Sequence, residues 1–430
     1  MNWTVSPGGV PRGTLRVPGD KSISHRSVML GSLAEGVTDV TGFLDGEDCL
    51  CTMKAFQAMG VRIERLGDTR LRVHGVGLRG LKAVGGALDL GNSGTSMRLM
   101  SGLMAAQNFG TVMVGDASLS RRPMRRVIEP LTRMGAHIDS NDGKAPLHLH
   151  PVDRLCGIEH VSAVASAQVK SCVLLAGLYA QGDTTVIEPE ASRDHTERML
   201  QAFGVRLQVA PGRVRIHDGQ VLHGTAIPVP ADISSAAFFM LAAALVPGSD
   251  LILQDVGINP TRTGVIDILR AMGASIEMSD ERTFGGEPVA DLRVRGQGLR
   301  GVAVDPTLVA SAIDEFPAVF VAAACAEGET LVTGAEELRV KESDRIQSMV
   351  DGLVALGIEA VATPDGARIR GGQFRSGQID SHGDHRVAMS FAMGALRAKG
   401  DIRIADVANV STSFPGFARL ATQAGLRIRL

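Results

Sequence analysis

Residues 232–274 read DISSAAFFMLAAALVPGSDLILQDVGINPTRTGVIDILRAMGA, and this stretch decides the fold because its pattern occurs six times in the chain. It opens with a polar head at 232–235 and continues into an apolar segment rich in Ala. A β-branched run at 251–253 predicts a strand. Apolar residues at helical spacing then fill 265–272 and end at Gly273. One copy therefore contains two different helices and the strands between them.

The other copies share the polar head and the closing glycine. The closing steps are Met59-Gly60-Val61, Met134-Gly135-Ala136, Phe203-Gly204-Val205, Met272-Gly273-Ala274, Leu356-Gly357-Ile358 and Ala424-Gly425-Leu426. The heads lie about 40 residues upstream and are Lys21-Ser22, Asn92-Ser93-Gly94-Thr95, Ser166-Ala167-Gln168, Asp232-Ile233-Ser234-Ser235, Asp314-Glu315 and Asp384-His385-Arg386. Residues suited to chemistry gather in these heads and in the loops between the two helices of a copy.

The two helices of each copy differ in character. The first is apolar on nearly every side, which is typical of a buried helix, whereas the second has one apolar stripe and is expected to cover a sheet. Each copy is thus a βαβαββ-like unit. Because 430 residues exceed what one core usually supports, we expect an α/β protein of two domains. Each domain would be an inside-out α/β barrel of three units around buried parallel helices.

Proline-rich stretches predict where the chain passes between the domains. Residues 225–232 contain two prolines, which favour extended backbone, and the stretch before Asp20 contains Pro11 and Pro18. We therefore expect one domain over 20–229 and a second over 230–430 together with 1–19. The cleft between them is the expected active site.

Composition excludes several classes of function. The net charge is −2 and aromatic residues make up 3%, so a nucleic-acid-binding protein is not expected. The longest apolar run, at 236–246, is too short to span a bilayer, and no segment resembles a signal peptide. The five cysteines show no metal-binding spacing and are expected to be reduced. We expect a cytoplasmic enzyme, a monomer, with no membrane partner, metal or other cofactor.

The heads are candidate anion sites, because the start of a helix presents free N–H groups and the positive end of its dipole. Helix capping alone also explains Ser, Thr, Asp or Asn at these places. It does not explain Arg26, Arg98 and Arg386, which lie in or beside apolar segments where an unpaired charge is costly. A bound anion or a buried carboxylate is the expected partner of each.

The loops add further charged residues, namely Arg122, Arg193, Lys341 and Arg345. Taken singly, each is more typical of a residue that faces solvent. Together with Lys21 and the arginines of the heads they predict substrates that carry several negative charges. Asp314 and Glu342 are the two acids among these cations, and such carboxylates can accept or relay protons.

At these residues the chain resembles the family of 5-enolpyruvylshikimate-3-phosphate synthases over nearly its whole length. The segments that carry the resemblance are Pro18-Gly19-Asp20-Lys21-Ser22-Ile23-Ser24-His25-Arg26, Leu90-Gly91-Asn92-Ser93-Gly94-Thr95, Val340-Lys341-Glu342-Ser343-Asp344-Arg345 and Gly383-Asp384-His385-Arg386. The resemblance implies a fold of six similar units that closes over shikimate 3-phosphate and phosphoenolpyruvate. It implies an enolpyruvyl transferase of the shikimate pathway that proceeds by addition and elimination and uses no cofactor.

The resemblance also implies the roles of individual residues. Shikimate 3-phosphate would be held by Lys21, Ser22, Arg26, Ser166, Ala167, Gln168, Arg193, Asp314 and Lys341. Phosphoenolpyruvate would be held by Lys21, Gly94, Arg122, Arg345 and Arg386, the last two clamping its carboxylate. Asp314, Glu342 and Lys21 are the expected catalytic residues, with Asp314 accepting the proton of the attacking hydroxyl.

Three positions depart from the pattern of other family members. Ala167 stands where some have Ser, Arg193 lies in a loop where others use a Tyr, and Thr412 replaces a Lys. Gly94 is retained where some members tolerant of the phosphonate inhibitor glyphosate carry Ala. The chain is therefore expected to be a glyphosate target.

Two other functions fit parts of the pattern. UDP-N-acetylglucosamine enolpyruvyl transferases share the fold, but they place a reactive Cys where this chain has Ala117. A noncatalytic repeat scaffold would be expected to show a basic surface bias and to lack the pair of Asp314 and Glu342, and neither expectation fits.

Overall fold

The first helix of every repeat begins within two residues of its polar head. The computed structural model describes residues 1–430, and these helices are α1 (Lys21–Leu33), α3 (Gly94–Met104), α5 (Ala167–Gly177), α7 (Ile233–Leu245), α10 (Phe316–Ala324) and α12 (His385–Gly394). Side chains accept hydrogen bonds from first-turn N–H groups of five of them, and the capping residues are Asp20, Ser93, Ser166, Asp232 and Asp384. The fifth repeat differs because a short helix, α9 (Val309–Ala312), precedes α10.

The second helix of every repeat ends at the predicted glycine step. These helices are α2 (Glu47–Ala58), α4 (Arg125–Arg133), α6 (His195–Ala202), α8 (Gly264–Ala271), α11 (Arg345–Ala355) and α13 (Phe417–Gln423). The glycine two residues beyond each helix has a positive φ, from 85° at Gly357 to 102° at Gly425. Residues other than glycine adopt this conformation at a cost, which explains the repeated glycine.

The chain forms two compact units, of which unit 2 contains residues 19–229 and 284–287. Its four-stranded sheets have the orders β16-β3-β5-β4, β6-β7-β9-β8 and β11-β13-β15-β14. The strands are β3 (Glu35–Thr41), β4 (Arg62–Gly67), β5 (Arg70–Val76), β6 (Leu88–Asp89), β7 (Thr111–Val114), β8 (Ile138–Asn141), β9 (Lys144–Leu149), β11 (Glu159–Val161), β13 (Thr184–Ile187), β14 (Leu207–Ala210), β15 (Arg213–Ile216) and β16 (Ala226–Pro228), with a small extra pair, β10 (Leu155–Cys156) and β12 (Ala180–Gln181). In each four-stranded sheet the first pair is parallel and the others are antiparallel.

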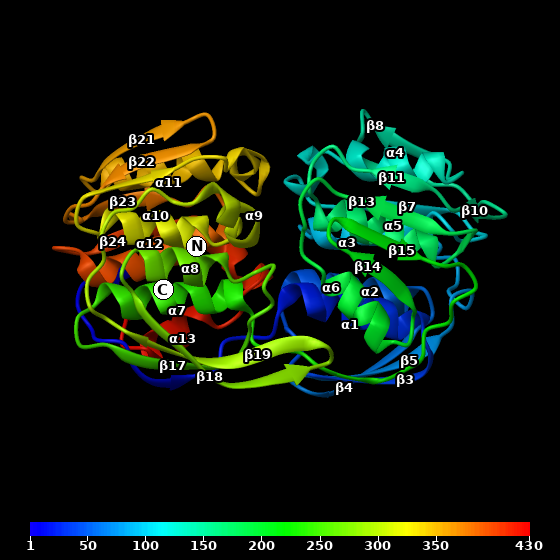
Figure 1. Ribbon diagram of the computed structural model, residues 1–430, viewed down its shortest axis with the longest axis horizontal. Coiled ribbons are helices and arrows are strands. Elements are labelled where there is room, and N and C mark those ends of the chain that lie inside the picture. Colours follow the sequence, from blue (N-terminus) through cyan, green and yellow to red (C-terminus); the bar gives the residue numbers. More distant parts are fainter. The chain divides into compact units, whose positions relative to one another are not determined.

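Unit 1 contains residues 1–18, 230–283 and 288–430 and likewise has three main sheets, two with four strands and one with three (Figure 1). Its sheets have the orders β18-β19-β17-β2, β20-β22-β21 and β23-β24-β1-β25. The strands are β1 (Trp3–Ser6), β2 (Arg12–Leu15), β17 (Asp250–Gly257), β18 (Ser275–Phe284), β19 (Glu287–Arg295), β20 (Glu329–Val332), β21 (Glu359–Thr363), β22 (Gly366–Arg370), β23 (Gly377–Asp380), β24 (Ile402–Ala405) and β25 (Arg427–Arg429). The N-terminal strands β1 and β2 thus complete sheets formed mainly by residues after 249.

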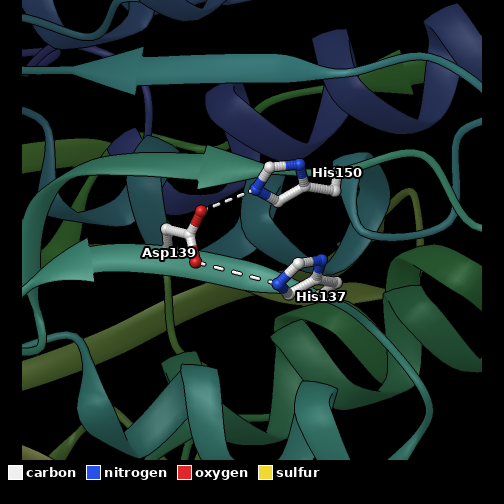
Figure 2. A group of neighbouring side chains, drawn as sticks. All are labelled: His137, Asp139 and His150. Atoms are coloured by element: carbon white, nitrogen blue, oxygen red, sulfur yellow. Dashed lines mark hydrogen bonds and ion pairs between the residues drawn. The ribbon is translucent and has the colours of Figure 1, made fainter.

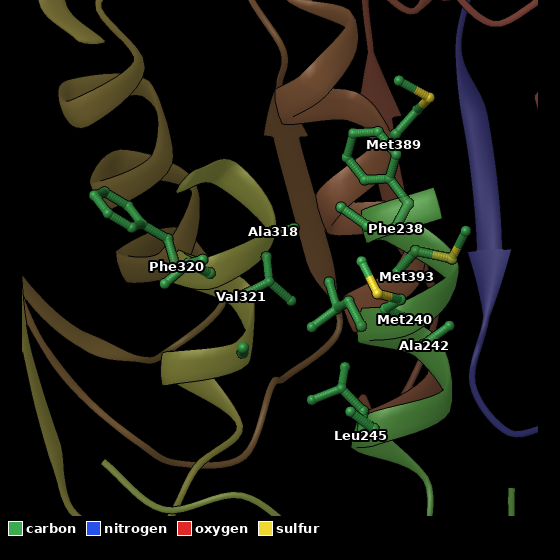
Figure 3. Packing of buried hydrophobic residues seen from close by; sticks show 14 of the residues in the cluster. Phe238, Met240, Ala242, Leu245, Ala318, Phe320, Val321, Met389 and Met393 are labelled. Atoms are coloured by element: carbon green, nitrogen blue, oxygen red, sulfur yellow. The ribbon is translucent and has the colours of Figure 1, made fainter. Parts of the chain in front are cut away.

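The core of each unit is built around the first helices of its repeats. All residues of α7 are buried, as are all residues of α10, and both helices pack on each other and on α12. Figure 3 shows the large side chains of this core, among them Phe238, Met240, Met389 and Met393. The second helices bury one stripe, as α8 does with Val265, and leave the rest exposed. The predicted α/β fold with buried central helices is confirmed.

All five cysteines are free thiols. None of the helices is both long enough and apolar enough to cross a membrane.

Candidate functional site

Hydrogen bonds join the N-terminal parts of the three central helices in unit 2. Arg26 of α1 donates to Ser171 Oγ of α5 at 2.9 Å, and Arg98 of α3 donates to Gln168 Oε1 of α5 at 2.7 Å. Gln168 Nε2 in turn donates to Thr95 Oγ1 of α3 at 3.1 Å. The three helices therefore begin at the same end of the unit, where their N–H groups and dipoles together favour an anion.

Arg26 is a buried cation among neutral acceptors. Its side chain is 5% exposed, and it donates to Thr196 Oγ1 at 2.7 Å and to Ser22 O at 3.0 Å in addition to Ser171. Burial lowers the pKa of Arg26 to about 10, with a lesser contribution from Arg193, although the charges of Glu197, Asp20 and Glu287 partly offset this lowering. A bound anion would add a favourable charge interaction with Arg26.

Lys21 and Arg122 lie beside neighbouring helix starts. Lys21 forms an ion pair with Asp48 of α2, and Arg122 Nη2 donates to Asn92 Oδ1 in the α3 head at 2.8 Å. Gly94 lies close to Arg122: a β-carbon built on it would lie 3.2 Å from Arg122 Nη1. The same β-carbon would lie 3.0 Å from Arg98 Nη1, so the α3 head and the Arg122 loop leave little room for any side chain at position 94.

A buried lysine anchors the Ser166 head and the Arg193 loop. Lys170 Nζ lies 2.9 Å from both Glu188 and Glu197, and it donates to Ser192 O at 3.2 Å. Glu188 also accepts from the backbone N–H of Ser166 at 2.9 Å and from Ser192 Oγ at 2.8 Å. None of the sequence motifs named above includes this cluster, although a lysine inside the apolar α5 is a signal for it.

In unit 1 the structure corrects the expectation for Arg345. Singly, this arginine was expected to be a loop residue facing solvent, but it is the first residue of α11 and its side chain is 1% exposed. Its Nε donates to Asp384 at 2.8 Å, and its Nη2 donates to Glu342 at 2.6 Å. Although burial alone would lower the pKa of Arg345, the carboxylates of Asp384, Glu342 and Asp314 raise it above its usual value.

Asp314 lies among three cations. Its carboxylate is 3.4 Å from Arg345, 3.8 Å from Lys341 and 3.9 Å from Arg386. Arg386 of α12 also donates to Asp314 O at 2.9 Å and lies 3.7 Å from Glu315, which accepts from Ser234 of α7. These contacts join the first turns of α7 and α12 to the residues that precede α10. The helix starts of unit 2 are joined in a similar way.

The residues named from the sequence divide between the two units. Unit 2 contains Lys21, Ser22, Arg26, Gly94, Arg122, Ser166, Ala167, Gln168 and Arg193, and unit 1 contains Asp314, Lys341, Glu342, Arg345 and Arg386. Thr412, where other family members carry a Lys, is buried and donates to Asn409 O at 2.7 Å. Its hydroxyl proton is therefore already engaged.

His25 provides a pH test of this environment. Its ring is buried in α1 and lies 2.8 Å from Thr52 Oγ1. Burial, together with the charges of Lys21 and Arg26, holds the pKa of His25 well below 6.5. Below this pH the unfolded chain binds a proton that the folded chain does not. The free energy of unfolding should therefore fall on acidification, by up to about 1.4 kcal/mol per pH unit from this residue.

Urea denaturation at several pH values between about 6.5 and 5 measures this slope. In His25→Asn the free energy of unfolding should change less steeply with pH, by up to that amount. His217→Asn, which changes a solvent-accessible histidine, is the control and should keep the slope of the parent chain. An unchanged slope in His25→Asn would contradict the assignment.

A family model described as EPSP synthase (3-phosphoshikimate 1-carboxyvinyltransferase) matches residues 5–420. The chain belongs to the EPSP synthase family. It is 64% identical over 429 residues to 3-phosphoshikimate 1-carboxyvinyltransferase of Methylococcus capsulatus, covering 100% of this chain and 98% of the relative. The relative of the same name from Nitrosococcus oceani is 60% identical, and the alignment covers 100% of this chain and 97% of that relative.

The fold agrees with the family. EPSP synthase from Acinetobacter baumannii superimposes with a TM-score of 0.90 at 52% identity, with both chains covered completely. The predicted resemblance is therefore confirmed, and the comparisons give no support to the two other functions considered.

Proposed function

We propose that the chain is a 3-phosphoshikimate 1-carboxyvinyltransferase of the shikimate pathway, which serves aromatic amino-acid biosynthesis. It transfers the enolpyruvyl group of phosphoenolpyruvate to the 5-hydroxyl of shikimate 3-phosphate and releases phosphate. The observation that carries this function is the family match over residues 5–420. The free cysteines are consistent with a function in the cytoplasm, where thiols are kept reduced.

For shikimate 3-phosphate we propose binding by the residues that the resemblance implies. Arg26 and Arg193 would hold the phosphate, because Arg26 is buried among neutral acceptors and Arg193 lies near it. The other proposed contacts are Lys21, Ser22, Ser166, Ala167, Gln168, Asp314 and Lys341. Lys170 would support this site indirectly, since it pairs with Glu188 and donates to the backbone of Ser192, next to Arg193.

For phosphoenolpyruvate we propose Lys21, Gly94 and Arg122 at the phosphate and Arg345 with Arg386 at the carboxylate. Arg122 and the first turn of α3 lie together, so a phosphate there would receive both a charged hydrogen bond and backbone N–H groups. Arg345 is already held by carboxylates on three sides. It would therefore present a fixed orientation to the ligand.

The proposed reaction has two steps. The 5-hydroxyl oxygen attacks C2 of phosphoenolpyruvate and loses its proton to Asp314, while C3 gains a proton and a tetrahedral ketal forms. Loss of a proton from C3 then expels phosphate and restores the double bond. Glu342 and Lys21 are assigned to the proton at C3 and to the leaving phosphate. Arg345 Nη2 donates to Glu342 at 2.6 Å and so holds this carboxylate in one orientation. A fixed orientation suits a group that exchanges a proton with a single carbon atom, C3.

A coupled assay of phosphate release from phosphoenolpyruvate tests the function. Release should require shikimate 3-phosphate, and the second product should carry the enolpyruvyl group on its 5-oxygen. Release that is independent of shikimate 3-phosphate, or that requires UDP-N-acetylglucosamine instead, would contradict the proposal.

Gly94→Ala should raise the inhibition constant of glyphosate more than the KM for phosphoenolpyruvate. The added methyl would lie 3.0 Å from Arg98 and 3.2 Å from Arg122, so the guanidinium groups must move by a few tenths of an ångström. Glyphosate is longer than the substrate and has less room for this adjustment. Steady-state inhibition against phosphoenolpyruvate measures both constants. Gly110→Ala, where the nearest atom is 3.7 Å away, is the matched control. Equal inhibition constants for the parent and Gly94→Ala would show that this glycine does not limit the site.

A further inference from the structure

A cluster of histidine and aspartate side chains lies on the solvent face of the β8–β9 hairpin, among residues to which the proposed reaction assigns no role. The backbone pairs Asp139 with His148, and the N–H of His150 donates to His137 O at 2.9 Å. His137 immediately precedes β8 and Asp139 lies on it, while His148 lies on β9 and His150 immediately follows it. Since alternate residues of a strand face the same side, all four side chains share one face.

Three of these residues point their polar atoms at one another. His150 Nε2 lies 2.7 Å from Asp139 Oδ2, and His137 Nε2 lies 3.8 Å from Asp139 Oδ1 (Figure 2). The two imidazole rings stack with their centroids 4.3 Å apart. One ligand atom from each of the three residues lies within 4.8 Å of the others. The ring stack and the hydrogen bond hold this arrangement together without any ion.

We propose that His137, Asp139 and His150 bind a divalent transition metal ion such as Zn²⁺, with water in the remaining positions. Two neutral imidazoles and one carboxylate form a ligand set that suits Zn²⁺, Ni²⁺ or Cu²⁺ rather than Mg²⁺ or Ca²⁺. Zinc bonds of about 2.0 Å place neighbouring tetrahedral ligand atoms about 3.3 Å apart. His150 Nε2 and Asp139 Oδ2 lie closer together than this value, at 2.7 Å, whereas the ligand atoms of the three residues lie within 4.8 Å of one another, so the side chains must move to surround an ion.

The charge state of the cluster suits a cation. Asp139 contributes the carboxylate of the three residues, and its negative charge attracts a cation. The three residues are at least 42% exposed in their side chains, so an ion can enter from solvent. Bound metal would connect β8 to β9 at the end of the hairpin opposite its turn.

The test uses the full chain without a histidine tag, stripped of metal with a chelator and titrated with ZnCl₂ by calorimetry. We expect one Zn²⁺ per chain and a rise in the temperature of unfolding. His150→Ala and His137→Ala should each weaken the affinity at least about tenfold, because each removes a direct ligand. His217→Ala removes a lone histidine that lies 3.0 Å from Asp183 and should leave the affinity unchanged.

A second measurement needs no variant. Cu²⁺ added to the stripped parent chain should give an electron paramagnetic resonance spectrum with couplings from two nitrogens. No zinc binding by the parent, equal affinity in His150→Ala, or a copper spectrum without nitrogen couplings would each overturn the site. Phosphate release from phosphoenolpyruvate should be unaffected in the two histidine variants, which separates this proposal from the proposed function.

Discussion

Glu342→Ala should lower kcat by about 100-fold to 10,000-fold, the usual contribution of a positioned acid or base, while the chain still folds. In the proposed reaction this carboxylate handles the proton at C3. Arg345 would lose one partner but would keep Asp384 at 2.8 Å and Asp314 at 3.4 Å, so the buried guanidinium stays paired. The coupled phosphate-release assay measures kcat, and circular dichroism with urea denaturation verifies folding.

The matched variant is Glu342→Gln. Its side-chain oxygen can still accept from Arg345 Nη2, which donates to Glu342 at 2.6 Å in the parent, so the geometry is retained while the acid–base function is lost. We expect it to be nearly as impaired as the alanine variant. A glutamine variant with near-normal kcat would show that Glu342 orients groups without transferring a proton. A normal kcat in both variants would remove Glu342 from the mechanism.

Arg345→Met should destabilise the chain by about 3 to 5 kcal/mol, the usual cost of removing one partner from a buried ion pair. The side chain of Asp384 is 0% exposed and that of Arg345 is 1% exposed, so water cannot replace the lost partner. The variant would leave Asp384, Glu342 and Asp314 as neighbouring carboxylates without their common cation. Urea denaturation of the ligand-free chain measures the free energy of unfolding.

Two further variants test whether the loss of stability comes from the buried charge. Arg429→Met removes an exposed pair with Asp401 in the same unit, where the N–O distance is 2.8 Å, and should cost less than about 1 kcal/mol. Arg345→Met combined with Asp384→Asn removes both charges and should recover part of the loss, since asparagine can still cap α12. Equal stabilities of Arg345→Met and Arg429→Met would contradict the importance of burial.

Local features of the sequence predicted the elements of this fold. The polar heads and the glycine steps determine where helices start and stop through bonds and dihedral angles that involve only nearby residues, as at Asp20 and Gly60. The buried first helices were evident because they carry no polar stripe. The assignment to a family came from motifs that are short and continuous, and the comparisons confirmed it.

Pairings between distant residues were decided only by the tertiary structure. The sequence does not reveal that Thr196 and Ser171 hold Arg26, or that Asp384 holds a buried Arg345, because these partners come from different elements. The choice of partner depends on which surfaces remain to be paired after the helices have packed.

The sheets show the same division between local and long-range information. Short alternating runs predicted strands, but β1 and β16 pair with strands far away in the chain, at β24 and β3. The cluster of His137, Asp139 and His150 likewise depends on the register between β8 and β9, since a shift by one residue would place the histidines on opposite faces. The sequence by itself determined the repeating unit and the chemistry available to it. The tertiary structure decided which charges meet, because burial and long-range pairing arise only when the units are assembled.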